Sequence, residues 1–155
     1  KKFKVGISWK SFKNRYADEK SLKLTDIGYL FENNHIDFIN LQYGDVENQI
    51  KQIENQTDKS INTINKVDLS NDIGSISNII TQCDLVITID NTLAHLSGSI
   101  GQKTWVLLPY SADWRWFENI DHSLWYQNTI LFRQGPSRTW DEIIAQIKIK
   151  INQII

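Results

Sequence analysis

The sequence is poor in the residues that build disulfides, metal clusters and rigid loops. Its 155 residues include one cysteine, two prolines, seven glycines and no methionine. The single cysteine, Cys83, excludes a disulfide framework and any metal site that needs several cysteine ligands. It lies in an apolar stretch, where we expect an inert core residue. This cysteine usage is typical of a reducing compartment, and we expect a cytoplasmic location.

The sequence also lacks an excess of either charge and any long apolar run. Lys and Arg together number 17, against 18 Asp and Glu, which argues against a nucleic-acid binder, because such proteins carry a basic excess. No apolar run reaches the roughly 20 residues of a membrane-spanning helix. The start, KKFKVGISW, leads directly into an expected strand and is unlike a signal peptide. We expect one domain over residues 1–155, cut from a longer chain, with no nucleic-acid partner and no membrane span.

Motifs of several common enzyme classes are missing as well. No Gly-x-Gly-x-x-Gly follows the first expected strand, and neither a Gly-Lys-Ser/Thr loop nor a nucleophile elbow is present. These absences disfavour dinucleotide oxidoreductases, P-loop NTPases and α/β hydrolases. No grouping of Asp, His and Glu has the spacing of a metal site. The sequence therefore predicts neither a metal nor a cofactor.

What the sequence does contain is an alternation of strand and helix patterns. Short runs of β-branched residues predict strands, and apolar residues three and four apart predict helices. We expect strands at residues 3–9, 36–41, 60–65, 85–89 and 105–108, helices at 24–33, 44–56, 73–82 and 140–153, a short helix after Thr92, and helix caps at Asn71-Asp72 and Thr139. This alternation predicts an α/β fold with a Rossmann-like, doubly wound parallel sheet.

The most informative stretch runs from residue 84 to residue 117. Its two apolar runs, 85–89 and 105–108, are continuous, as in strands that helices cover on both faces. A polar turn, Asp90-Asn91-Thr92, follows the first of these strands and begins a helix. Ligands of open α/β sheets bind at the carboxyl edge, and the free amides of a helix start favour anions. The turn therefore predicts a phosphate site.

The spacing of three side chains supports this site. Asn91 and Thr92 precede His95 by four and three residues, so we expect all three side chains on one face of the first helical turn. From this pattern alone an alternative is equally open, in which Asp90 only caps the helix and His95 is a packing histidine.

Six segments, in order along the chain, carry a family resemblance. They read VGISW, FINLQYG, DLVITIDNTLAHLSGSIG, LLPYSADWRWF, WY and LFRQ. Together they resemble the carboxyl-terminal half of family 9, heptosyltransferase-like glycosyltransferases. They resemble more closely the glycosyltransferase-like domains that follow tetratricopeptide repeats in many bacterial proteins, which are related to O-linked N-acetylglucosamine transferases. The resemblance runs from Val5 to about Trp140 and is most specific in the strand-turn-helix and in DWRW.

The resemblance implies one half of a two-domain GT-B enzyme. In that family the carboxyl-terminal half holds a nucleoside-diphosphate sugar, here of UDP or ADP type, and the other half contacts the acceptor. We therefore expect a donor-binding domain that is inactive without its amino-terminal half, in a parent chain that also carries tetratricopeptide repeats. Catalytic residues are not predicted. The alternative is a non-catalytic module that binds a nucleotide or a protein and retains only the fold.

The resemblance also implies which residues contact the diphosphate. The family's Asp-Thr pair falls on Asp90-Asn91, followed by Thr92, and its histidine falls on His95. Its basic residue falls on Lys20, where a cation is expected near the diphosphate. Asn91 replaces a threonine but still donates and accepts hydrogen bonds.

Weaker candidates follow the other expected strands. The candidates for phosphate contact lie in or after the first strand: Ser8, Trp9, Lys10 and Lys13. Gln42, at the end of the second strand, is a candidate for the base or ribose. After the third strand, where the relatives contact the base or ribose, the candidates are Lys66, Val67, Asp68 and Leu69. For each set the alternative is a solvated loop or a structural turn. Of the family's acidic residues at the next helix only Asp72 remains, which weakens base recognition from that helix.

An aromatic cluster follows the last expected strand. It comprises Trp114, Trp116, Phe117, Trp125 and Tyr126. Such a cluster more often closes a core or a domain interface than forms a sugar platform, and both interpretations stay open. Arg115 is expected to stack on its tryptophan neighbours. His35 and His122 are expected at the surface.

Overall fold

A parallel sheet carries the structure. The computed structural model describes residues 1–12 and 15–155. Five strands, β1 (Phe3–Ser8), β2 (Ile36–Asn40), β3 (Leu85–Ile89), β4 (Thr104–Leu108) and β5 (Thr129–Arg133), pair in the order β2-β1-β3-β4-β5, all parallel. The central strands β3 and β4 are buried along their whole length, because both faces of the sheet are covered. This confirms the α/β, Rossmann-like prediction.

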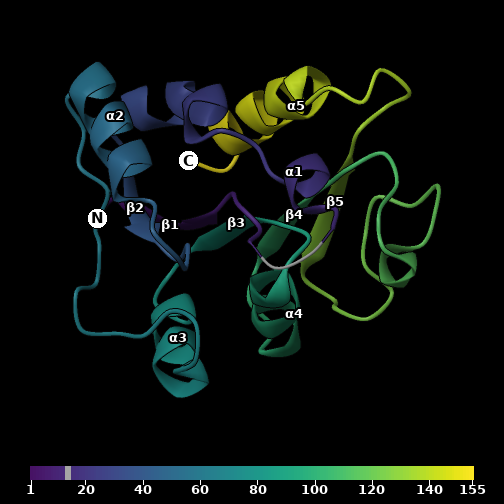
Figure 1. The fold of residues 1–155 in the computed structure, drawn as a ribbon, viewed down its shortest axis with the longest axis horizontal. Coiled ribbons are helices and arrows are strands. Elements are labelled where there is room, and N and C mark those ends of the chain that lie inside the picture. Colours follow the sequence, from purple (N-terminus) through teal and green to yellow (C-terminus); the bar gives the residue numbers. More distant parts are fainter. Residues whose placement is uncertain (13–14) are drawn as a thin grey trace.

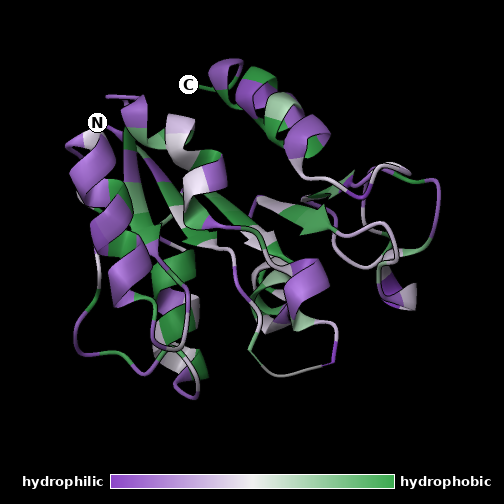
Figure 2. Ribbon diagram, turned by 45° about the horizontal axis from the view of Figure 1, so that its top comes forward, coloured by the Kyte–Doolittle hydropathy of each residue, from purple (hydrophilic) through white to green (hydrophobic). Residues whose placement is uncertain are grey.

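Helices cover the two faces of the sheet in separate layers (Figure 1). One face packs against η1 (Leu24–Glu32), α2 (Glu47–Thr57) and α5 (Asp141–Asn152), and the other packs against α3 (Ile73–Ile80) and α4 (Thr92–Ser99). Figure 2 shows apolar and polar residues alternating along these helices, and the apolar ones supply the buried clusters that pack against the sheet. None of the helices in the described residues is long and apolar enough to cross a membrane.

Several details differ from the sequence-based expectations. The strand expected at 60–65 is wrong: only Asn62 pairs, through a single parallel bridge to Ile39 on β2, and its neighbours offer no continuous apolar face. The fifth strand is β5 instead, a short edge strand that the aromatic stretch before it obscured. Residues 24–32 form a 3-10 helix with a kink at Ile27, whereas an α-helix was expected.

The helix caps were predicted in part. The side chain of Asp72 accepts a hydrogen bond from the Ser75 amide, 3.0 Å away, and so caps α3 as expected. Thr139 does not cap α5, because that helix begins at Asp141 and the Thr139 hydroxyl lies 3.3 Å from the hydroxyl of Ser137. A short helix, α1 (Ala17–Lys20), lies between β1 and η1, where the sequence predicted no helix.

Two helical glycines should respond in opposite ways to alanine. A Cβ at Gly98 on α4 would lie 2.5 Å from the ring of Tyr126, whereas a Cβ at Gly74 on α3 would meet nothing closer than 3.8 Å. We expect Gly98→Ala to lower the free energy of unfolding by about 1–3 kcal/mol through overpacking. Gly74→Ala should raise it by about 0.5–1 kcal/mol, because alanine is the better helix former. Urea unfolding of both variants measures this; equal shifts of one sign would contradict the packing of Tyr126 against α4.

Candidate functional site

The predicted site lies where the strand order of the sheet reverses. From β1 the chain crosses to β2 on one side and returns to β3 on the other, so the point where the strand order reverses, at which ligands of open α/β sheets bind, lies at the carboxyl ends of β1 and β3. These two ends lie side by side, since Ser8 and Thr88 are neighbours in the register. Asp90, Asn91 and Thr92 follow directly after β3 and begin α4. The structure therefore places the polar turn at the ligand edge, as predicted.

An ion pair between Lys20 and Asp90 lies at this edge. Lys20 Nζ is 2.9 Å from Asp90 Oδ2, and the two side chains are only 15% and 5% exposed. The two residues are 70 positions apart in sequence, and the fold brings them together. The family resemblance implied that each contacts a diphosphate, but not that the two side chains pair. Asp90 Oδ2 accepts no hydrogen bond from any other described residue. Lys20 is therefore the partner of this oxygen, and the buried carboxylate needs it, because an unpaired charge in a protein interior is strongly destabilising.

The loop that carries Lys20 is fixed to β1. The Leu22 amide donates to the carbonyl of Trp9, 3.0 Å away, and the Leu22 side chain is buried in the core. The Ser21 hydroxyl accepts from the Ser11 amide at 2.9 Å and donates to the Ala17 carbonyl at 2.6 Å. These contacts hold the backbone around α1, so that the Lys20 side chain extends from a fixed position toward the end of β3.

Asp90 has a second partner that the sequence did not reveal. The buried indole of Trp116 donates its Nε1–H to Asp90 Oδ1 at 2.8 Å. Trp116 belongs to η2 (Trp114–Trp116), which is capped by Asp113 through a 3.0 Å hydrogen bond from the Arg115 amide. The DWRW block thus joins the polar turn by a direct side-chain contact. The aromatic character of the block was visible in the sequence, but the contact depends on the loop path and was not.

Asn91, rather than Asp90, caps α4. Its Oδ1 accepts from the Ala94 amide at 3.3 Å and from the Thr88 hydroxyl at 3.1 Å. Its Nδ2 donates to the hydroxyl of Ser8, 3.0 Å away on β1. The alternative in which Asp90 is the cap is therefore wrong. Asn91 and Ser8 both lie at the carboxyl edge of the sheet, as predicted. Most of their hydrogen bonds are internal and connect β1, β3 and α4.

Gln42 is buried and shapes the turn after β1. Its Oε1 accepts from the Ser8 hydroxyl at 3.0 Å and from the amides of Trp9 and Lys10 at 2.9 and 2.7 Å. Its Nε2 donates to the carbonyls of Lys10 and Tyr43 at 3.0 and 2.8 Å. With five internal hydrogen bonds, Gln42 has the structural role that was weighed against ligand contact.

Thr92 and Leu69 line one cavity beside the ion pair. This cavity, of about 130 Å³, lies between the end of β2 and the amino-terminal ends of α3 and α4. It is mainly apolar, with Leu41, Tyr43, Leu69, Ser70, Ile73, Ile76, Asn91, Thr92, Leu93 and Leu96 around it. The Thr92 hydroxyl is exposed and has no hydrogen-bond partner among the described residues. The cavity thus combines a mainly apolar lining with polar groups at the helix start.

The other residues predicted near a base or ribose lie around this cavity without lining it. Val67 is partly buried and packs against the same apolar cluster as Leu69. Asp68 is fully exposed and accepts hydrogen bonds from the Ser70 amide and the Asn71 side chain, both 2.8 Å away. Hydrogen bonds from Asn71 and then from Ser70 hold the pKa of Asp68 below its ordinary value. The ionised Asp68 carboxylate therefore holds this loop in place through its hydrogen bonds to Ser70 and Asn71.

His95 lies one helical turn after Asn91 and Thr92 on α4, but it does not line the cavity that these two residues line. Its ring stacks on Trp116 with centroids 4.8 Å apart, and its Nδ1 is 3.0 Å from the hydroxyl of Tyr126. Burial lowers the pKa of His95 below its ordinary value, so the imidazole is neutral at physiological pH. The structure does not bring the three side chains into one cavity, because the His95 ring packs against Trp116 and Tyr126 of the aromatic loop.

The remaining cations near β1 have aromatic partners. Lys10 Nζ lies 4.8 Å from the ring centroid of Phe12, and the Arg15 guanidinium lies 5.9 Å from that of Tyr16. Lys13 lies outside the described residues. Lys66 is exposed, as are His35 and His122, which confirms the surface prediction for these histidines. Trp9 is buried and donates its indole N–H to Gln49 at 2.8 Å, so it belongs to the core.

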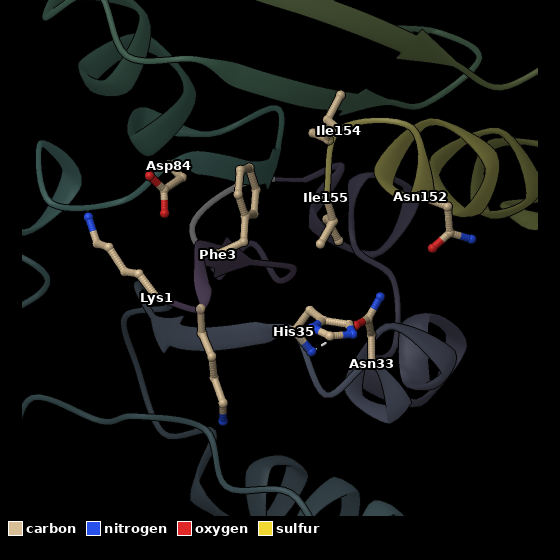
Figure 3. A pocket seen from close by; sticks show the side chains of 9 residues that line it. Lys1, Phe3, Asn33, His35, Asp84, Asn152, Ile154 and Ile155 are labelled. Carbon is tan, nitrogen blue, oxygen red and sulfur yellow. Dashed lines mark hydrogen bonds between the residues drawn. The ribbon is translucent and has the colours of Figure 1, made fainter.

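A separate cavity of about 540 Å³ lies at the opposite, amino-terminal edge of the sheet. Both ends of the chain line it, together with Phe3, His35 and Asp84 (Figure 3). None of the residues predicted to bind a nucleotide reaches it. Within residues 1–12 and 15–155, no group of three His, Cys, Asp or Glu side chains is arranged to hold a metal ion.

Comparisons with known proteins agree with this architecture. No protein-family model matches the sequence. Protein FlbA of Caulobacter vibrioides is 26% identical over 148 residues, which are 93% of this chain and 24% of FlbA. The chain thus spans about a quarter of that curated relative.

Solved glycosyltransferases share the fold. Two structures of Escherichia coli heptosyltransferase WaaC, one with ADP-2-deoxy-2-fluoro heptose and one with ADP, match with TM-scores of 0.69 and 0.70 at 12% identity. They cover 99% and 97% of this chain, which in turn covers 44% of each WaaC chain. A family 9 glycosyl transferase from Veillonella parvula matches with a TM-score of 0.60 at 14% identity, over 96% of this chain and 38% of that one. The chain therefore has the Rossmann-like fold found in one half of these GT-B enzymes.

Proposed function

We propose that this chain is the donor-binding domain of a glycosyltransferase and binds a nucleoside-diphosphate sugar. The observation that carries the proposal is the Lys20–Asp90 pair beside the start of α4, at the point where the strand order reverses. A cation and the free amides of a helix start together suit a diphosphate. In a sugar transfer the same groups would stabilise the charge that develops on the leaving diphosphate.

The geometry supports a specific direction for the nucleotide. The apolar cavity at Leu69 and Thr92 suits a base, and the cation at Lys20, which does not line this cavity, pairs with Asp90 just before the start of α4. A nucleotide would then place its base between α3 and α4, its diphosphate across Thr92 and Lys20, and its sugar toward the aromatic loop. Because the WaaC structures contain ADP and an ADP-sugar, adenine is the first base to test.

Calorimetric titration tests this proposal at the level of affinity. We expect ADP, UDP or GDP to bind the 155-residue chain, and the matching nucleoside to bind at least about tenfold more weakly, because it lacks the charge-assisted contacts. A panel in which no diphosphate binds more tightly than its nucleoside would remove the basis for a diphosphate site.

The isolated chain is expected to bind a donor without transferring its sugar. A GT-B active site lies between two halves, and this chain spans 44% of the matched WaaC chains. The parent protein is therefore proposed to supply the acceptor-binding half, and the tetratricopeptide repeats implied by the resemblance stay a prediction. Transfer assays with the same donor and acceptor should show turnover for the full-length protein only. Comparable turnover from the 155-residue chain would contradict this division of roles.

One observation favours the second candidate, a non-catalytic module that retains the fold. Asn91, Ser8 and Gln42 make internal hydrogen bonds with most of their polar atoms. Such a module binds its ligand or partner without transfer, so an inactive full-length protein that still binds a nucleoside diphosphate would favour it.

A further inference from the structure

Another cavity lies between His95 and the aromatic loop. It has a volume of about 290 Å³ and is lined by His95, Trp114, Arg115, Trp125 and Tyr126. Trp114 and Trp125 are 68% and 56% exposed, which is unusual for the largest apolar side chain. The third tryptophan of the cluster, Trp116, is fully buried. It closes the core, which is one of the two roles that the sequence left open for the cluster. The two exposed indoles therefore have no role in the core.

Side-chain contacts hold the walls of this cavity in place. The indole of Trp125 donates to the carbonyl of Arg115 at 2.8 Å. The guanidinium of Arg115 lies 2.8 Å from Asp113 Oδ1 and 4.8 Å from the ring centroid of Trp114. On the opposite wall the Tyr126 hydroxyl lies 3.0 Å from His95 Nδ1. A ligand would meet aromatic faces that are already ordered, which lowers the entropy cost of binding.

The lining selects for a ring that is apolar on its faces and polar at its edge. The indole faces offer broad apolar surface, whereas Arg115 and the imidazole of His95 offer hydrogen bonds beside it. A purely apolar ligand would leave these polar groups without partners. A pyranose ring has both surfaces, since its C–H groups lie on its faces and its hydroxyls along its edge.

One buried residue, Trp116, connects the cavity to the proposed diphosphate site. The buried ring of Trp116 stacks on His95, which lines the cavity, while its indole N–H binds Asp90, the partner of Lys20. A group attached to a diphosphate at Lys20 would therefore lie next to the aromatic loop.

We propose that the cavity formed by His95, Trp114, Arg115, Trp125 and Tyr126 binds a pyranose ring. That the ring is the sugar of the bound nucleotide rests on the proposed function; a sugar of an acceptor glycan has the same chemistry. Carbohydrate binding itself follows from the lining alone.

The indole N–H resonances of the six tryptophans provide the test in the intact 155-residue chain. The probes are the methyl glycosides of glucose, N-acetylglucosamine and mannose, and the pairs ADP with ADP-glucose and UDP with UDP-glucose. We expect sugar-bearing probes to shift the Trp114 and Trp125 resonances and to leave those of the buried Trp9 and Trp105 unchanged. A response only to nucleotide sugars assigns the ring to the donor, and a response to free glycosides that is independent of nucleotide assigns it to an acceptor.

Two variants make the test quantitative. Trp114→Ala and Trp125→Ala remove exposed rings and should preserve the fold, which the amide spectrum checks; Ile149→Ala, on the exposed face of α5, is the control. Each tryptophan variant should weaken binding of the sugar-bearing probe about 2- to 12-fold and leave ADP and UDP affinity unchanged. No shift at Trp114 or Trp125 with any glycoside or nucleotide sugar would overturn the inference.

The two proposals fail in different ways. If diphosphates shift the amides of residues 90–95 but no sugar reaches the indoles, the donor site stands and the pyranose site falls. If glycosides shift the indoles while no diphosphate shifts those amides, the pyranose site stands and the proposed function falls.

Discussion

Trp116→Ala should lower the free energy of unfolding by about 3–5 kcal/mol, a large fraction of the stability of a domain of this size. The Trp116 side chain is completely buried among Ala94, Val106, Leu108 and Leu131, so its removal leaves a large cavity. The substitution also removes the hydrogen bond that the Trp116 indole donates to Asp90 Oδ1. A buried carboxylate oxygen is then left without this donor, which adds to the loss. Urea unfolding followed by circular dichroism measures the loss.

Two further variants separate packing from hydrogen bonding. Trp116→Phe keeps an aromatic ring but no indole N–H, and should cost roughly 1–3 kcal/mol for the unsatisfied Asp90 oxygen. Trp114→Ala, two positions earlier and 68% exposed, should change stability by less than about 0.5 kcal/mol. If Trp116→Ala and Trp114→Ala cost the same, the aromatic loop does not pack as described.

Lys20→Ala should weaken binding of a nucleoside diphosphate more than Thr92→Ala does. A hydrogen bond to a charged group typically contributes about 1.5–3 kcal/mol, against about 0.5–1.5 kcal/mol for a neutral one. The expected losses in affinity are therefore about 10- to 150-fold for Lys20→Ala and about 2- to 12-fold for Thr92→Ala. The effect of Lys20→Ala should shrink as salt rises, because screening already weakens the contact between the cation and the phosphate.

Lys103→Ala is the matched control for Lys20→Ala. Lys103 is exposed at the amino-terminal end of β4, on the opposite edge of the sheet, so its removal changes the net charge equally without touching the site. Lys20→Ala also leaves Asp90 buried without a cation, and binding is therefore measured under conditions where unfolding curves show the variant to be folded. Unchanged affinity for Lys20→Ala at low salt would place the cationic role on Lys10, Lys13 or Arg15.

The sequence predicted the elements whose own pattern determines them. β3 and β4 are continuous apolar runs because helices cover both faces, and such runs are visible without knowledge of the partners. The site turn was also predictable, since it follows from the position of Asp90, Asn91 and Thr92 at a strand end. The strand at 60–65 was wrong because β-branched residues alone do not supply a pairing partner; β2 offers Asn62 one bridge only.

The contacts between distant segments were less accessible. The family resemblance singled out both Lys20 and Asp90, but neither it nor any local pattern specified the ion pair between them. The bond from Trp116 to Asp90 and the displacement of His95 toward Tyr126 depend on the path of the loop between β4 and β5, which lacks any periodicity. Residues on one helical face were therefore assigned to one ligand, whereas the structure divides them between two cavities.

Amide NMR during titration with ADP, UDP and GDP tests the central claim, a diphosphate site at the start of α4, most directly. The account predicts that at least one diphosphate at millimolar concentration shifts the backbone amides of residues 90–95, with smaller changes at the amino-terminal edge around Lys103. A folded chain in which none of the three shifts the amides of residues 90–95 would contradict it.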